Sequence, residues 1–205
     1  MRWLGVVATV LLLHAPGIGE PFDHLPFDAI LRTYVNAEGE VDYSGLKANR
    51  SSLDAYVDSL ARISPKSHEG RFASRAEKLA YWINAYNALV LRGVIDAYPV
   101  KSVKDIKYLS GFFNRTWHTV GGESYTLNNI EHDILRAEFV EPRIHAAINC
   151  ASVGCPRLEA RAFFSDDIDS RLEAAITTFL REERNVTIDI QNKTVKLSKI
   201  LDWFE

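Results

Sequence analysis

The 205-residue chain lacks several features that mark large classes of protein. It has no cluster of lysine and arginine, and with a formal charge of −3 it is a poor candidate for binding nucleic acid. It has no internal repeat with a period of roughly 20 to 50 residues, which excludes solenoids and propellers. Its composition, with 47% hydrophobic and 25% charged residues, is typical of a globular protein.

Long apolar runs are also scarce. The run from Trp3 to Leu13 follows Arg2 and precedes the small residues Gly17 and Gly19. A helix needs about 20 apolar residues to cross a bilayer, so this run is too short to span one. We interpret residues 1–19 as a signal peptide cleaved after Gly19, and residues 20–205 as a single domain. This predicts a periplasmic or secreted protein with no stable membrane span after the signal is removed.

Apolar periodicity predicts the fold class. Helical spacing predicts helices over residues 27–35, 44–62, 77–98, 128–139 and 166–184. Ser44 is suited to cap the second helix, and Pro99 ends the third. Hairpins are predicted around Gly121-Gly122 and over residues 186–198, before a last helical turn. The result is an α+β class, a mainly helical domain with small antiparallel hairpins packed on a central buried helix.

The central helix carries two asparagines, Asn84 and Asn87, on a largely apolar surface. A buried amide without partners costs roughly 1 to 3 kcal/mol, so both are expected to hydrogen-bond a neighbouring loop. Such amides either satisfy backbone groups, with no chemistry of their own, or help to bind a substrate.

The stretch RIHAAINCASVGCPRL, residues 143–158, contains both cysteines of the chain. Alternation predicts a short strand at residues 143–149 that runs into a loop at Cys150. Strand-end loops often display reactive groups. Cys150 and Cys155 therefore suit a reactive thiol site, a disulfide favoured by export, or inert buried thiols.

Two histidines compete as the base for such a thiol. On a straight strand His145 would lie roughly 16 Å from Cys150, so the two would not touch. His132, on the preceding helix, is an equal candidate. Its neighbour Glu131 should point about 100° away around the helix, which argues against a tightly coupled Glu131–His132 pair.

A metal site is less well supported. The two cysteines form only half of a common zinc signature, C-x₂₋₄-C, with no matching H-x₃₋₅-H or second cysteine pair. No HExxH motif and no calcium loop occurs in the sequence. We therefore expect neither a metal nor a cofactor.

Several motifs together resemble one family. They are LAYWINAYNALV, the VGG turn, YTLNNIEHDILR, EPRIHAAINCASVGCP and VKLSKILDWF, with VDY at residues 41–43. In this combination and order the chain resembles the domain-of-unknown-function family 547. The resemblance implies an exported bacterial protein of mixed helices and small antiparallel sheets. The shared polar positions it implies are Asn84, Asn87, Glu131, His132, Arg136, Arg143, His145, Cys150, Ser152, Cys155 and Pro156. Related domains usually continue past the WF element, so we expect the final packing element to differ here.

These residues support two hypotheses of different classes. In the first, Cys150 or Cys155 is the nucleophile of a thiol-dependent hydrolase or transferase acting on a small acyl or peptide-like substrate, with His132 or His145 as base. Glu131 would orient or bind, and Arg136 or Arg143 would anchor a carboxylate. Asn84, Asn87 and Ser152 would complete substrate binding. In the second, a Cys150–Cys155 disulfide shapes the recognition loop of a secreted binding module that performs no chemistry.

Overall fold

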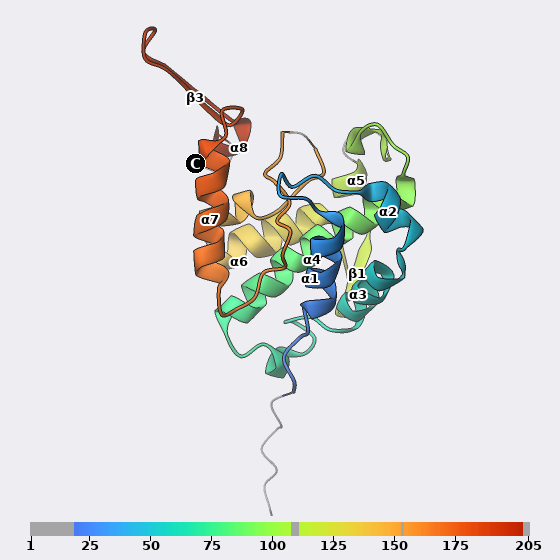
Figure 1. Cartoon of the computed structure of the whole chain (residues 1–205). Coiled ribbons are helices and arrows are strands. Elements are labelled where there is room, and N and C mark those ends of the chain that lie inside the picture. The colour runs from blue at the N-terminus through green and yellow to red at the C-terminus, as the bar shows by residue number, and fades with distance from the viewer. Residues whose placement is uncertain (1–18, 108–110, 153, 203–205) are drawn as a thin grey trace, which may run out of the picture.

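The computed structural model describes residues 19–107, 111–152 and 154–202, so nearly all of the predicted signal peptide lies outside the described residues. The first half of the chain is helical up to a short hairpin (Figure 1). Its elements are α1 (Leu25–Tyr34), α2 (Tyr43–Ala48), α3 (Ser51–Arg62), η1 (Glu69–Arg71), α4 (Arg75–Ala97), η2 (Val103–Asp105), α5 (Gly111–Asn114), β1 (His118–Val120) and β2 (Glu123–Tyr125). The second half continues with η3 (Asn129–Arg136), α6 (Ala137–Phe139), η4 (Pro142–Ala146), α7 (Ile168–Arg181), β3 (Val186–Asp189), β4 (Thr194–Leu197) and α8 (Lys199–Asp202).

The helix α4 forms the centre of the fold. It begins with a capping box, in which the Ser74 side chain accepts from the Glu77 amide and the Glu77 carboxylate accepts from the Ser74 amide. Every residue from Leu79 to Leu91 is buried. A helix that is buried on all sides needs neighbours all round, and α2, α3 and η3 pack directly against α4. The predicted central helix is therefore confirmed.

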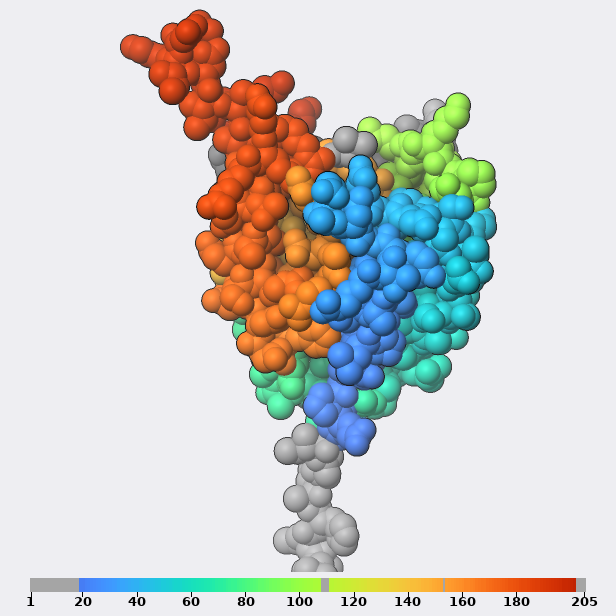
Figure 2. All heavy atoms as spheres, viewed as in Figure 1, coloured from blue at the N-terminus to red at the C-terminus, as the bar shows by residue number. Residues whose placement is uncertain are grey.

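The two predicted hairpins are also confirmed, and they form separate two-stranded sheets. In the β1–β2 hairpin Val120 pairs with Glu123, and both turn glycines have positive φ, as expected of a tight two-residue turn. This hairpin packs on α3. The β3–β4 hairpin, residues 186–197, instead extends away from the body of the fold, as Figures 1 and 2 show.

The second predicted helix differs in detail from the expectation. It is divided into α2 and α3, which are separated by Asn49 and Arg50. Asp42 caps α2 by accepting a hydrogen bond from the Gly45 amide, 2.8 Å away, so the cap predicted at Ser44 is wrong. Asp and Ser are both good capping residues, and because α2 begins at Tyr43, Asp42 and not Ser44 occupies the cap position.

The strand predicted at residues 143–149 is wrong, because the segment begins with the 3₁₀-helix η4. Pro142 occupies its first turn, and Glu141 caps it by accepting from the Arg143 amide. The five residues from Ile144 to Ile148 are all buried, so the apparent alternation marks no exposed face. The chain rises only about 2.0 Å per residue in a 3₁₀-helix, which removes the basis for the expected 16 Å between His145 and Cys150.

Among the residues that the structure describes, no helix is both long enough and apolar enough to cross a membrane.

Candidate functional site

A pocket of about 350 Å³ brings together the five residues predicted to be catalytic. Four different parts of the chain supply its polar wall: Tyr86 from α4, Glu131 and His132 from η3, His145 from η4, and the Cys150–Cys155 loop. The remaining lining residues are Phe113, Asn114, Asn128, Ile148, Pro156 and Ile200. Residues that are far apart in the sequence thus meet around one cavity of a size suited to a small molecule.

Cys150 and Cys155 form a disulfide, with their Cα atoms 5.9 Å apart. The Cys155 amide also donates to the carbonyl oxygen of Ser152, at 2.9 Å, which closes a turn inside the loop. Cys150 is half-buried, whereas Cys155 is buried. Of the states left open by the sequence, the structure therefore contains the oxidised one.

Two asparagines connect this loop to the central helix. The Asn87 side chain donates to the carbonyl oxygen of Ala147 and accepts from the Asn149 amide, both at 2.9 Å. The Asn149 side chain in turn donates to the Pro156 carbonyl at 2.7 Å and accepts from the Ala151 amide at 2.7 Å. Two hydrogen bonds therefore fix the segment before the disulfide to α4, and two more from Asn149 hold the loop that the disulfide closes.

Asn84 likewise holds neighbouring backbone, at Phe163 and not at the cysteine loop. Its side chain donates to the carbonyl oxygen of Phe163 at 2.7 Å and accepts from the Phe163 amide at 2.9 Å. Asn84 is fully buried and is not part of the pocket wall. Asn84 and Asn87 thus hold neighbouring backbone, as one of the two interpretations of these amides expected, and a role in substrate binding stays a prediction.

The segment that carries Glu131 and His132 is a π-helix, Asn129–Arg136. Its i to i+5 hydrogen bonds make a wider turn than the α-helix that we expected, and such turns are frequent at functional sites. Both side chains line the pocket. The Tyr86 hydroxyl donates to Glu131 Oε2 at 3.1 Å, which fixes the carboxylate and helps to raise the pKa of the buried phenol, although burial is the larger cause.

His132 has a defined hydrogen-bonding state. Its Nδ1 lies 3.1 Å from Nη1 of Arg136, one turn later on the same helix. A guanidinium has no acceptor, so Nδ1 must accept from it, and the proton of a neutral His132 ring resides on Nε2. His132 is therefore suited to donate a hydrogen bond from Nε2.

His145, in contrast to the donor His132, is suited to accept a proton. Burial, together with the nearby Arg136 and His132, lowers the pKa of His145 to about 4. His145 is therefore neutral at physiological pH, and a neutral imidazole has one ring nitrogen without a proton. Arg136 donates to His132 and its charge acts on His145, which places Arg136 beside the pocket although it is not part of the wall.

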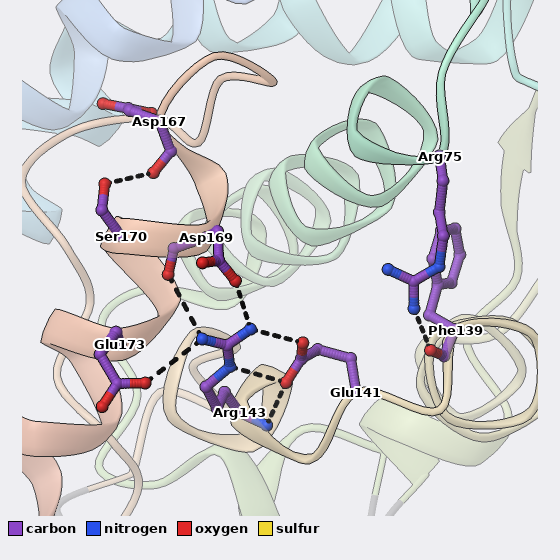
Figure 3. A network of polar contacts seen from close by, with 8 residues as sticks. All are labelled: Arg75, Phe139, Glu141, Arg143, Asp167, Asp169, Ser170 and Glu173. Carbon is purple, nitrogen blue, oxygen red and sulfur yellow. Dashed lines mark hydrogen bonds and ion pairs between the residues drawn. The ribbon is translucent and has the colours of Figure 1, made fainter.

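Arg143 is held by carboxylates of the chain itself. Its guanidinium bonds Glu141 in a bidentate manner, at 2.7 and 2.8 Å, and also contacts Asp169 at 2.6 Å and Glu173 at 3.3 Å (Figure 3). The hydrogen bond from Arg143 is the largest cause that lowers the pKa of Glu141. Arg143 does not line the pocket, and its contacts join η4 to α7. Among the described residues its partners thus belong to the fold, and a role for Arg143 in anchoring a substrate carboxylate stays a prediction.

Ser152 lies on another side of the disulfide loop. It lines a depression of about 440 Å³ together with Tyr43, Asn149 and Arg157, and only Cys155 and Pro156 belong to both cavities. The structure therefore separates Ser152 from the two histidines.

Two residues of the site escaped the sequence reasoning. Tyr86 was interpreted only as an apolar position of the central helix, yet its hydroxyl holds Glu131. Asn149 received no role, yet it spans the disulfide loop. A polar atom on an otherwise buried surface was the available signal for Tyr86, and the position of Asn149 next to Cys150 was the signal for Asn149.

No group of three or more histidine, cysteine, aspartate or glutamate side chains is arranged to hold a metal ion in the part of the chain that the structure describes.

The fold and the pocket define a mainly helical α+β domain with a disulfide-bonded loop at a histidine-containing pocket. Residues 71–180 match the model of the family described as "Protein of unknown function, DUF547". The match covers more than half of the chain and includes every predicted site residue, and the chain belongs to this family. Comparison with curated proteins and with solved structures finds no match for the chain.

Proposed function

We propose that this protein is an extracytoplasmic thiol-dependent hydrolase or transferase, and that the Cys150–Cys155 disulfide is its resting form. One observation carries the proposal: the five residues expected to be catalytic line a single pocket of about 350 Å³, although they come from separate elements. A small acyl or peptide-like substrate suits a cavity of this volume and mixed lining.

The thiol must first be released. A dithiol reductant gives up two electrons and two protons to the Cys150–Cys155 disulfide and itself becomes a disulfide. Of the two sulfur-bearing residues, Cys150 is the more exposed, so it is the better nucleophile, and buried Cys155 is the resolving partner that restores the disulfide.

The two histidines divide the proton chemistry. With a pKa of about 4, His145 is neutral but a weak base, so it accepts the proton of the Cys150 thiol while the sulfur attacks the substrate carbonyl carbon, not before. The His132 Nε2 proton stabilises the oxyanion that forms. The leaving group departs with the proton from His145, and water or an acceptor nucleophile then cleaves the thioester bond at Cys150.

Residues around these groups keep them in place. Glu131, held by Tyr86, fixes the polar wall on the η3 side. Arg136 keeps the His132 tautomer by donating to Nδ1. The Asn87 and Asn149 hydrogen bonds keep the cysteine loop in its conformation when the disulfide is reduced.

A test compares the reduced protein with Cys150→Ser and Cys155→Ser. We expect p-nitrophenyl acetate to leave an acetyl group on Cys150 in the reduced wild type and in Cys155→Ser, detected by mass spectrometry. The same acetylation in Cys150→Ser, or no acetylation of the reduced wild type, would contradict the proposal.

A second function is favoured by the disulfide itself. A loop closed by a bridge and fixed by four side-chain hydrogen bonds is preorganised for recognition, and a binding module needs no free thiol. This alternative predicts that the oxidised protein binds small acyl or peptide-like ligands as tightly as the reduced protein does, as measured by calorimetry, and that no acyl adduct forms in either state.

A further inference from the structure

The β3–β4 hairpin exposes an unusual share of the apolar surface. Eight large hydrophobic side chains are exposed among the residues that the structure describes, and four of them lie on this hairpin. They are Ile188 (66% exposed), Ile190 (84%), Val195 (60%) and Leu197 (54%). Apolar side chains gathered in this way on a soluble surface mark a site of interaction.

The strand register places three of these side chains, Ile188, Val195 and Leu197, on one face, and Ile190 lies in the turn between the strands. Val186 lies opposite Leu197, and Ile188 lies opposite Val195, so both pairs are on the same side of the two-stranded sheet. The intervening pair, Thr187 and Lys196, is on the other side. The hairpin is thus amphipathic in the manner of a half-buried sheet, although Ile188, Val195 and Leu197 on its apolar face are exposed and only Val186 is half-buried.

The position of the hairpin makes this face accessible. It stands clear of the body of the fold in the ribbon and in the space-filling view (Figures 1 and 2). An isolated two-stranded hairpin is only marginally stable in water, and a partner packed against its apolar face would stabilise it. An apolar face that projects from the body of the fold is suited to insert into a partner and poorly suited to enclose a ligand.

The charge of the hairpin indicates what kind of partner covers its apolar face. Residues 186–199 contain Lys193, Lys196 and Lys199 against the single acid Asp189, a net charge of +2 on a chain whose total is −3. Lysine stems can extend along an apolar surface and place the ammonium at a lipid headgroup. Each lysine near an anionic bilayer strengthens binding roughly fivefold.

We propose that the β3–β4 hairpin is a membrane-docking arm that inserts Ile188, Ile190, Val195 and Leu197 into the interface of an anionic lipid bilayer, while its lysines bind the headgroups. The charge complementarity favours this partner over a second copy of a chain, whose hairpin would repeat the same positive charge. Ile200, three residues beyond Leu197, lines the pocket, so a docked hairpin would hold that pocket beside the lipid surface. The docking does not depend on the function proposed for the pocket.

The test uses the full chain and vesicles of phosphatidylcholine with or without phosphatidylglycerol. Ile188→Thr with Ile190→Thr keeps the β-branched shape and removes apolar surface, and we expect about tenfold weaker sedimentation with the anionic vesicles. Lys193→Gln with Lys196→Gln should weaken it roughly twentyfold at low salt. The matched control is Leu25→Thr with Val140→Thr, which alters two exposed apolar residues elsewhere and should bind as the wild type does.

A local probe separates the hairpin from the apolar residues 3–13, which are identical in all these proteins. Gln191→Cys labelled with an NBD fluorophore at the hairpin tip should shift its emission to the blue when anionic vesicles are added. The proposal is overturned by an unchanged NBD spectrum, or by equal binding of the hairpin variants and the control. It is also overturned if light scattering shows a dimer that the Ile188→Thr, Ile190→Thr variant loses and no vesicle binding accompanies it.

Discussion

Asn87 holds the backbone of Asn149. The Asn87 Oδ1 atom accepts from the Asn149 amide at 2.9 Å, and the Asn149 side chain then spans the disulfide loop to the Pro156 carbonyl at 2.7 Å. The central helix therefore fixes the cysteine loop through buried amides and not through apolar packing alone.

Replacing Asn87 should be costly for this reason. Asn87→Ala leaves the buried Ala147 carbonyl and the Asn149 amide without partners, and each such group costs about 1 to 3 kcal/mol. We expect a loss of about 2 to 4 kcal/mol in the free energy of unfolding, measured with urea. The control Asn49→Ala removes one exposed hydrogen bond to Gly45 and should cost about 1 kcal/mol or less. Equal losses in the free energy of unfolding of the two variants would contradict the role of Asn87 in holding the cysteine loop.

The Arg143 network predicts an order of effects. Glu141 is the best shielded of the three carboxylates and is bonded in a bidentate manner, whereas Asp169 and Glu173 are mostly exposed. We expect Glu173→Gln to change the free energy of unfolding by less than about 0.5 kcal/mol, and Arg143→Gln to lower it by about 1 to 2 kcal/mol. Urea unfolding would measure both, and a larger cost for Glu173→Gln than for Arg143→Gln would refute the order.

The turn glycines of the first hairpin should respond unequally to alanine. Both have positive φ, +60° at Gly121 and +85° at Gly122. A Cβ at Gly121 would lie 2.1 Å from Ser64 Oγ, whereas a Cβ at Gly122 meets nothing within 4 Å. Gly122→Ala should therefore cost about 1 kcal/mol from backbone strain alone, and Gly121→Ala about 3 kcal/mol or more. Thermal melting of the two alanine variants would measure the difference in their stability. Equal stability of the two variants would show that the contact with Ser64 is unimportant.

Buried histidines make stability depend on pH. Burial is the main cause that lowers the pKa of His24, His118 and His145 to about 4, from 6.5. Between pH 6.5 and 4 the unfolded chain binds more protons than the folded one, so stability is fully present above pH 6.5 and is lost as the pH falls toward 4. Urea midpoints across this range should decrease with acidity. His145→Gln should flatten the slope, and an unchanged slope would show that His145 is not the neutral group that the pocket requires.

Opening the disulfide should have a modest effect on the whole fold. The bridge closes a loop of only six residues, and the chain-entropy model gives about 2 kcal/mol for such a loop. We expect the reduced protein to remain folded by circular dichroism, with a free energy of unfolding lower by about that amount. Global unfolding upon reduction would exclude a reduced working form.

The sequence predicted structure best where a single local pattern, such as apolar spacing or a turn motif, was sufficient to define the element. The helix α4 and the β1–β2 hairpin follow directly from apolar spacing and from a Gly-Gly turn, because local geometry dictates both. The segment after Pro142 shows the limit. Its alternation is that of a strand, but residues buried on every side carry no periodic signal, and the 3₁₀ turn was decided by the cap at Glu141 and by packing against α7.

The sequence by itself determined the family, the helical α+β class and the residue types available for chemistry. Only the tertiary structure decided which of them meet. His132, His145 and Cys150 line one pocket because η3 packs against both α4 and η4, whereas Ser152 lies in a separate depression and Arg143 in an ion-pair network on α7. Contacts between distant segments depend on how buried faces fit together, and this information is not contained in the spacing along any one segment.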